Sequence, residues 1–299
     1  MNHLNEQQLK NLEKKVIAFE LAGKKESKNK KVVIIGGQPA SGKTLLLVKL
    51  SEILNPENTI VINGDELRRY DPAYHKLSIK HDASVADKTQ KFANYLADSL
   101  KNEAMARGVN VIIEGTMRNY YVPLKTAQEF KERGYEASAH IMAVTGDRSM
   151  AGIYKRYEAQ KSLVGYGRFS NPEIHDQAYH AIPQTADKLF KNKDVNHINI
   201  YNYKADVIYT NSLQSPNRVT SEWKNIIPPS IIINNERRRI LGLDEKIEII
   251  QNWSLVVELQ RRRGVADEIP LKRLNTGLGE LKQMPDFREL LETKQGLQR

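Results

Sequence analysis

The chain has 299 residues, of which 40% are hydrophobic and 27% are charged. This composition can fill the core of one large domain with additions, and it excludes a chain that is disordered throughout. The sequence contains no cysteine, which excludes disulfide bonds, thiolate metal sites and cysteine nucleophiles. Its net charge of +10 favours an anionic partner, either a nucleic acid or a polyanionic small molecule.

Much of the positive charge lies near the two ends of the chain. The basic residues of these runs are Lys24, Lys25, Lys28, Lys30, Lys31, Arg237, Arg238, Arg239, Arg261, Arg262 and Arg263. Runs of this kind usually form a solvated surface, and we interpret them so here. The alternative is a binding face for an anion.

Residues 1–30 are expected to form an amphipathic helix followed by a basic linker. The apolar side chains recur at helical spacing and define one stripe: Leu9, Leu12, Val16 and Phe19. Asn5 followed by Gln8 fits the capping box that begins many helices. No segment has the hydrophobicity of a signal peptide or the ~20 apolar residues of a membrane span. We therefore expect a cytoplasmic protein without membrane contact.

Residues 31–225 alternate short apolar runs with helical patterns. The apolar runs are rich in β-branched residues and end in a turn or a polar residue: KVVIIGG, TIVING, NVIIEGT, SAHIMAV and ADVIYTN. This pattern is typical of buried parallel strands, with helices such as 43–54 and 88–107 between them. The predicted fold class is therefore α/β, a parallel sheet flanked by helices. Residues 226–299 begin at the break IIPP and are expected to form a helical C-terminal subdomain without a catalytic motif.

The segment GQPASGKT, residues 37–44, matches the phosphate-binding loop pattern G-x-x-x-x-G-K-[ST]. It directly follows the strand KVVIIG and precedes the helix KTLLLVKL, which is the context that this loop requires. In such loops backbone N–H groups bind phosphate oxygens, the lysine bridges the β- and γ-phosphates, and the hydroxyl ligates Mg²⁺. The expected nucleotide-binding residues are Gly37, Gln38, Pro39, Ala40, Ser41, Gly42, Lys43 and Thr44, with Thr44 as the metal ligand.

Asp65 follows the second predicted strand, in the segment INGDELRRYDP. Ligands of open α/β sheets gather beyond the carboxyl ends of the strands, where a carboxylate can accept the proton of an incoming hydroxyl. We expect this catalytic role. The alternative is that Asp65 caps the helix ELRRY, because Asp is a favoured N-cap.

The third predicted strand ends in NVIIEGTMRN, an apolar run followed by an acid, as in Walker-B strands. Glu114 would lie near the phosphates or the acceptor and could hold a Mg²⁺-bound water or a substrate hydroxyl. Thr116 and Arg118 follow on the same edge. The alternatives are a polar strand end for Glu114 and a surface position for Arg118.

Arg156 and Arg168 follow the fourth apolar run, in IYKRYEAQKSLVGYGRFSNPEIHD. Arg156 lies in a helical pattern, and Arg168 lies in a glycine-flanked loop. Phosphoryl transfer requires cations of this kind, because negative charge spreads over the γ-phosphate oxygens. The alternative for each is an ordinary surface arginine paired with a nearby acid such as Glu158.

The segments GQPASGKT, NGDELRRYDP, VIIEGTMRN, KRYE and GRFSNPEIHD, in this order, resemble the zeta-toxin family over roughly residues 30–215. The resemblance implies a P-loop kinase of a bacterial toxin–antitoxin system. Such kinases transfer the γ-phosphate of ATP, with Mg²⁺, to the 3′-hydroxyl of the sugar in UDP-N-acetylglucosamine. The product blocks an early step of cell-wall synthesis.

The resemblance also implies a role for individual residues. Its catalytic set is Lys43 in the loop, Asp65 as base, and the clamp on the γ-phosphate formed by Arg156 and Arg168. Its substrate-binding set is Asp65, Asp98, Glu114, Thr116 and Arg118. Asp98 departs from the family, which carries a glutamate on this helix, and the alternative is a surface Asp.

The resemblance further implies a UDP-sugar substrate and an antitoxin, because a small helical antitoxin commonly occludes the nucleotide site of zeta toxins. Residues 1–30 offer a second candidate for this role, a helix that restrains ATP access in cis, although we favour plain packing for it. Three alternatives for function stay open: a kinase of another small acceptor such as NAD or an antibiotic, a polynucleotide kinase, and a toxin acting through a protein partner. The net charge alone favours a nucleic-acid partner, and we do not expect one.

Overall fold

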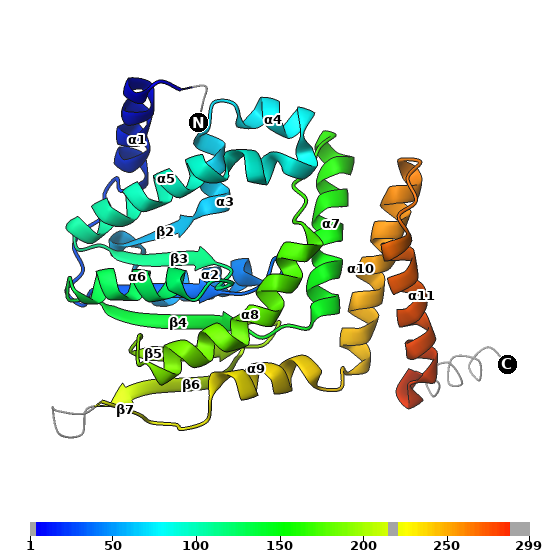
Figure 1. Ribbon diagram of the computed structural model, residues 1–299. Coiled ribbons are helices and arrows are strands. Elements are labelled where there is room, and N and C mark those ends of the chain that lie inside the picture. The colour runs from blue at the N-terminus through cyan, green and yellow to red at the C-terminus, as the bar shows by residue number, and fades with distance from the viewer. Residues whose placement is uncertain (1–3, 215–220, 288–299) are drawn as a thin grey trace.

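The computed structural model describes residues 4–214 and 221–287. Its sheet has the strand order β2-β3-β1-β4-β5-β6-β7 (Figure 1). The strands are β1 (Lys31–Gly36), β2 (Thr59–Asn63), β3 (Asn110–Gly115), β4 (Glu136–Met142), β5 (His197–Tyr201), β6 (Val207–Gln214) and β7 (Glu222–Trp223). The helices are α1 (Glu6–Glu20), α2 (Lys43–Ile53), α3 (Gly64–Leu67), α4 (Tyr74–Lys80), α5 (Val85–Ala106), α6 (Tyr121–Lys131), α7 (Gly146–Val164), α8 (Pro172–Lys191), α9 (Pro229–Arg238), α10 (Leu243–Arg262) and α11 (Glu268–Gln283). Short 3₁₀ turns lie at Pro56–Asn58, Arg68–Tyr70 and Asp82–Ser84.

The first five strands of the sheet are parallel, as the sequence predicts. Strand β1 lies between β3 and β4, so the segment that follows β1 emerges at the centre of one sheet edge. Parallel strands have their carboxyl ends at the same edge, which is where ligands of open α/β sheets bind. The α/β fold class is therefore confirmed, and it places the phosphate-binding loop next to the ends of β3 and β4.

Strand β6 corrects one prediction. The run ADVIYTN was expected to form a parallel strand, but β6 pairs antiparallel with β5. The connection between the two strands is residues 202–206, which is too short for the crossover that parallel strands need. The Asn202 side chain accepts hydrogen bonds from the backbone N–H of Lys204 and Asp206 and so closes this turn. Strand β5 itself was not predicted.

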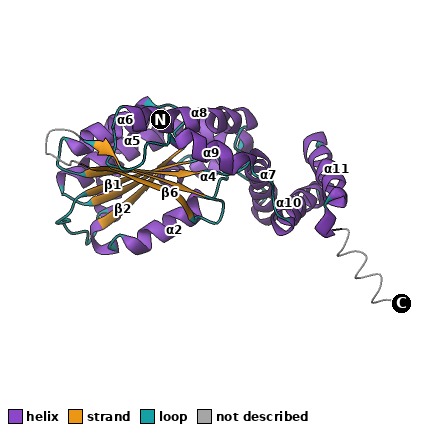
Figure 2. Ribbon diagram, turned by 90° about the horizontal axis from the view of Figure 1, so that it is seen from below, coloured by secondary structure: helices purple, strands orange, loops and turns teal. Residues whose placement is uncertain are grey.

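Helices cover the two faces of the sheet unequally. Helix α2 lies on one face, whereas α5, α6 and α8 lie on the other (Figure 2). The core under α2 includes Leu46 and Leu50, packed against Val33 and Ile35 of β1. The larger core on the opposite face is formed by the fully buried side chains of α5, α6 and α8 and includes Val16 of α1.

Helix α1 begins with the predicted capping box, in which the side chains of Asn5 and Gln8 each accept from the other's backbone N–H. It packs on α5 through its apolar stripe, and Val16 is 2% exposed. Phe19 corrects the prediction for this stripe, since it is 69% exposed. The helix ends at Glu20, and the following residue Leu21 takes the buried position instead.

The C-terminal segment is helical, as predicted, and residues 288–299 lie outside the described part. Helix α10 runs along α7 and α11 packs on α10 (Figure 1). Trp253 of α10 is 1% exposed and packs against Tyr154 of α7. The interpretation of 237–239 as a solvated run is wrong for Arg237, which is 7% exposed. Helix α9 packs on α8 and carries Arg237 inward.

Candidate active site

The loop after β1 has the backbone of a phosphate-binding loop. Gly42 at its end has a φ of 89°, in the left-handed region that favours glycine, and begins α2. A Cβ on Gly37 would lie 2.3 Å from the Oγ of Ser41, so the loop folds on itself too tightly for another residue there. The Nζ of Lys43 donates to the carbonyl oxygens of Gly37 at 3.0 Å and Gln38 at 3.1 Å.

This loop fits a bound triphosphate. The Oγ of Ser41 is buried, and no hydrogen-bond partner among the described residues satisfies it. The amino group of Lys43, which is 9% exposed, points across the loop. Thr44 is an exposed residue in the first turn of α2, at a helix N-terminus that favours anions.

Two acidic side chains lie at the neighbouring ends of β2 and β3. Asn63 pairs in register with Glu114, and its Nδ2 donates to Glu114 Oε2 at 2.8 Å. The Oδ1 of Asn63 accepts from the backbone N–H of Asp65 at 2.9 Å and caps α3. The alternative that Asp65 is the N-cap is therefore wrong, and its carboxylate is available for other contacts. Glu114 Oε1 lies 3.8 Å from the Nζ of Lys43.

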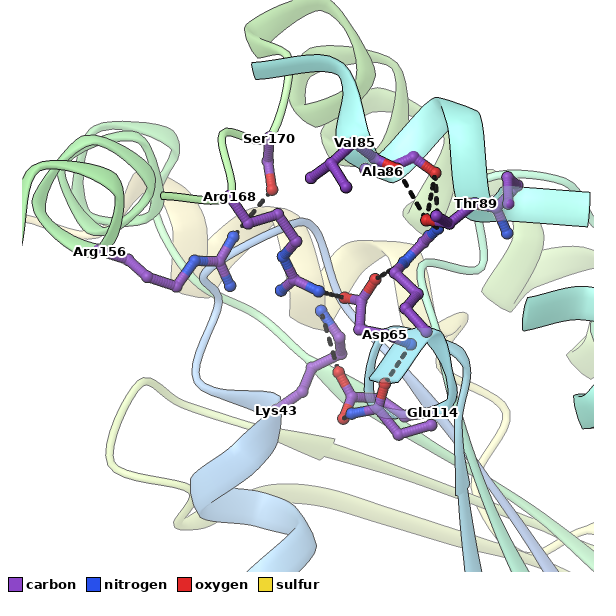
Figure 3. Close-up of polar contacts among 12 residues, drawn as sticks. Lys43, Asp65, Val85, Ala86, Thr89, Glu114, Arg156, Arg168 and Ser170 are labelled. Carbon is purple, nitrogen blue, oxygen red and sulfur yellow. Dashed lines mark hydrogen bonds and ion pairs between the residues drawn. The ribbon is translucent and has the colours of Figure 1, made fainter. Parts of the chain in front are cut away.

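The carboxylate of Asp65 contacts two arginines, and Figure 3 shows the contact with Arg168. Arg168 Nη1 is 2.7 Å from Asp65 Oδ2, and Arg68 Nε is 3.2 Å from Oδ1. Arg68 is 3% exposed, and its remaining N–H groups donate to Ala86 O, Thr89 Oγ1 and Gln90 Oε1 on α5. Arg68 was not among the predicted site residues. Its spacing of three residues from Asp65 is the signal that could have indicated it.

The charges of this cluster shift the protonation of its members. Burial alone would raise the pKa of Asp65, but Arg168 and Arg68 hold it below its usual range. Burial raises the pKa of Glu114, against the opposing effect of Lys43. Burial lowers the pKa of Lys43, against the opposing effects of Glu114 and Asp65. Asp65 is therefore the carboxylate of this pair that stays ionised over the wider pH range.

Arg156 comes from α7 and Arg168 from the loop that follows it, and in the view of Figure 3 Arg168 lies between Arg156 and Asp65. Arg156 Nη2 donates to Ser170 Oγ at 2.8 Å, and its Nε is buried without a partner among the described residues. Burial lowers the pKa of Arg156 to about 10, and Arg168 adds to the effect. Both arginines are half-buried, and the acid that Arg168 binds is Asp65 of this cluster. Glu158, the acid of the alternative interpretation, pairs with Arg263 instead.

The remaining predicted substrate residues lie further out. Arg118 is exposed, and its Nη1 donates to Gln177 Oε1 of α8 at 3.1 Å. Thr116 Oγ1 accepts from the backbone N–H of Arg118 at 3.4 Å. Asp98 on α5 has a side chain that is 72% exposed and pairs with Lys101 at 3.5 Å. The structure thus brings Lys43, Asp65, Glu114, Arg156 and Arg168 together, whereas the contacts of Asp98, Thr116 and Arg118 lie outside this cluster.

The phosphate-binding loop at the end of the central strand places the chain among the P-loop nucleotide-binding proteins. The model of the zeta toxin family matches residues 18–214, and the chain therefore belongs to that family. Toxin zeta of Enterococcus hirae is 29% identical over 238 residues, which cover 77% of this chain and 80% of that protein. Toxin PezT of Streptococcus pneumoniae is 30% identical over 189 residues, 62% of this chain and 74% of that protein.

A solved structure from the PezAT chromosomal toxin–antitoxin system of Streptococcus pneumoniae shares the fold. It superposes with a TM-score of 0.70 at 24% sequence identity, and the match covers 92% of this chain and 98% of that chain. The likeness covers more of this chain than the family model does. Across the described residues of the present chain, no helix has the length and hydrophobicity needed to cross a bilayer.

Proposed function

We propose that this protein is a zeta-toxin-type kinase that transfers the γ-phosphate of ATP to the 3′-hydroxyl of the sugar in UDP-N-acetylglucosamine or a related UDP-sugar. Family membership supports a phosphotransferase. One observation carries the kinase assignment: Asp65 is held ionised by two arginines beside a phosphate-binding loop whose lysine is buried. The sugar acceptor rests on the family resemblance of the segments around Asp65 and Glu114.

In the proposed reaction Asp65 orients the acceptor hydroxyl and takes its proton. The acceptor oxygen forms a bond to the γ-phosphorus while the bond to the β–γ bridging oxygen breaks, and ADP leaves with that electron pair. Lys43, Arg156 and Arg168 stabilise the charge that spreads over the transferring group. Because Arg168 contacts Asp65 directly, the clamp and the base are linked by one ion pair. Glu114, Thr116, Arg118 and Asp98 are the proposed acceptor contacts.

Mg²⁺ neutralises charge on the β- and γ-phosphates when it is bound with ATP. The Thr44 hydroxyl, in the first turn of α2, is the side chain that would hold it. Across residues 4–214 and 221–287 no group of three His, Cys, Asp or Glu side chains forms a candidate metal site.

We further propose a cytoplasmic location and an antitoxin partner. The substrates of the proposed reaction are cytoplasmic metabolites. The fold is shared with a protein of the PezAT toxin–antitoxin system, which supports a partner of the antitoxin kind. Restraint of ATP access by α1 in cis would be a substitute for such a partner, and the packing of α1 on α5 does not require it.

The test is mass spectrometry of reactions that contain the purified protein, ATP, Mg²⁺ and a panel of UDP-sugars, NAD, nucleosides and short oligonucleotides. The wild type should add one phosphoryl group to a UDP-sugar. Asp65→Asn should bind ATP normally and transfer about 10²–10⁴-fold more slowly, because it removes a general base. Phosphorylation of NAD or an oligonucleotide in place of a UDP-sugar would contradict the acceptor, and a near-normal rate for Asp65→Asn would contradict the base.

A further inference from the structure

Arg237 is a buried arginine without an acidic partner. It lies in the last turn of α9 and is 7% exposed. Among the described residues no Asp or Glu forms an ion pair with it, and its Nε has no hydrogen-bond partner. Burial lowers its pKa to about 10, so the guanidinium still carries its charge at neutral pH. An unpaired buried charge is costly, so the polar groups that contact this guanidinium stabilise it.

The contacts of Arg237 lead to the phosphate-binding loop. Its Nη1 donates to the carbonyl oxygen of Tyr179 at 2.6 Å, and its guanidinium lies 4.1 Å from the centre of the Tyr179 ring. Its Nη2 donates to Oε1 of Gln38 at 3.1 Å. Tyr179 thus fixes the plane of the guanidinium, and the remaining donor is aimed at the second residue of the loop.

Gln38 is fully buried and is held from both ends of its amide. Its Nε2 donates to the carbonyl oxygen of Val144 at 2.9 Å and to Ser149 Oγ at 3.2 Å, while its Oε1 accepts from Arg237. Its backbone carbonyl accepts from the Nζ of Lys43 at 3.1 Å. The same residue therefore connects the loop lysine with the segment between β4 and α7, with α7 itself and with α9.

We propose that Arg237 is a positioning residue of the nucleotide site, which sets the shape of the phosphate-binding loop by holding the side chain of Gln38. The C-terminal segment then forms part of the ATP site, although it lies beyond the residues that match the family model. This inference rests on the proposed use of ATP. The positive charge of Arg237 behind the loop also favours the negative charge that a triphosphate brings to its front.

The experiment compares the binding of ATP–Mg²⁺ to the full chain by titration calorimetry, without an acceptor, in the wild type and in Arg237→Gln. We expect roughly 10- to 100-fold weaker binding, the usual consequence of losing a hydrogen bond from a charged donor to a buried acceptor. The KM for the acceptor should stay the same. A positioning role at the nucleotide site predicts weaker ATP binding with an unchanged KM for the acceptor. A general loss of folded protein would instead lower the apparent amount of active enzyme and change neither the ATP dissociation constant nor this KM.

Two further variants separate position from charge and from folding. Arg238→Gln removes the same charge from the next residue of α9, which is exposed, and should bind ATP as the wild type does. Arg237→Lys keeps the charge but lacks the planar fork that reaches both Tyr179 and Gln38, so its affinity should fall between those of the wild type and Arg237→Gln. Arg237→Lys also serves as the test if Arg237→Gln does not fold.

The Gln38→Ala background tests the route of the effect. If Arg237 acts through Gln38, then Arg237→Gln should change ATP affinity by less than about twofold once Gln38 is Ala. A full and additive loss in the double variant would overturn the inference, as would equal ATP affinity of the wild type and Arg237→Gln. A wild type that bound no ATP would overturn the proposed function as well, so the two failures are distinguishable.

Discussion

The N-terminal helix and the C-terminal helices both lie outside the sheet, but they relate to the candidate site in different ways. Helix α1 does not contact the site directly. Its last residue, Glu20, accepts a hydrogen bond from Tyr70 and pairs with Arg69. The residue before Arg69 is Arg68, which binds Asp65. The C-terminal segment contacts the phosphate-binding loop directly, through Arg237 and Gln38. A basic run with no recognisable motif thus lies closer to the nucleotide site than the helix for which a regulatory role was considered.

The two regions also differ in how they are held. Helix α1 is attached by an apolar stripe on α5 and by the hydrogen bond from Tyr95 to Glu13. Helix α10 is attached by a cluster around Trp253, in which the indole Nε1 donates to Asp147 Oδ1 at 3.3 Å. Asp147 lies in the first turn of α7, two residues from Ser149, which contacts Gln38. Packing of α10 therefore supports the same part of the loop that Arg237 holds.

The largest effect on stability is expected for Trp253→Ala. Removing a buried tryptophan leaves a cavity between α10 and α7 and should lower the free energy of unfolding by about 3–5 kcal/mol, measured by urea denaturation. Leu255→Ala on the same helix is the control, since Leu255 is 36% exposed and its loss should cost far less. ATP affinity should fall with Trp253→Ala. Two separate unfolding transitions would contradict the claim that packing of α10 supports the phosphate-binding loop, because the C-terminal helices would then fold independently of the loop.

The second-largest effect is expected for Arg68, which binds Asp65 and precedes the Arg69 that pairs with Glu20 of α1. Arg68→Gln removes one of the three arginine charges that lower the pKa of Asp65, so that pKa should rise. A base works when it is deprotonated, and activity is lost as the pH falls through its pKa. The acid limb of the kcat/KM profile should therefore move to higher pH. The move should be only part of the pKa lowering that the arginines cause together, because Arg168 remains beside Asp65.

Arg69→Gln is the control for this pH profile, because Arg69 has a side chain that is 55% exposed and does not contact Asp65. The profile is scaled to its own plateau, so a smaller amount of folded protein does not shift it. Loss of the bonds from Arg68 to α5 should also lower the free energy of unfolding by about 1.5–3 kcal/mol. An unchanged acid limb together with this loss would make Arg68 a structural residue only.

The contrast between these regions shows what the sequence could predict. The phosphate-binding loop, Asp65 and Glu114 were predictable, because each follows an apolar run and parallel strands place such positions at one edge. Arg68 is a local contact, three residues from Asp65, and was open to prediction. Arg237 was not, since it lies far along the chain from Gln38 and its basic neighbours resemble solvated surface. The antiparallel direction of β6 follows from the short connection at residues 202–206, and the amino-acid composition of a strand does not indicate its direction.

The smallest effect is expected for Glu20→Gln, and it decides whether α1 does more than pack. Glu20 accepts from the Tyr70 hydroxyl at 2.6 Å and lies 3.2 Å from Arg69 Nη2. A neutral amide can still accept from Tyr70, and a partly exposed ion pair contributes about 0–1 kcal/mol, so kcat should change by less than about threefold. Steady-state rates of purified protein give the measurement.

Glu13→Gln is the matched control for Glu20→Gln, because Glu13 also accepts from a tyrosine hydroxyl, that of Tyr95 at 2.6 Å, but at a point away from the Arg68 segment. If α1 only packs, the two variants should have similar stability and similar rates. A faster rate in Glu20→Gln alone would mean that the end of α1 restrains Asp65 through Arg68 and Tyr70. That result would support a restraint of the site by α1 in cis. The restraint would then act at Asp65, on the acceptor side of the site, whereas Arg237 acts on the nucleotide side.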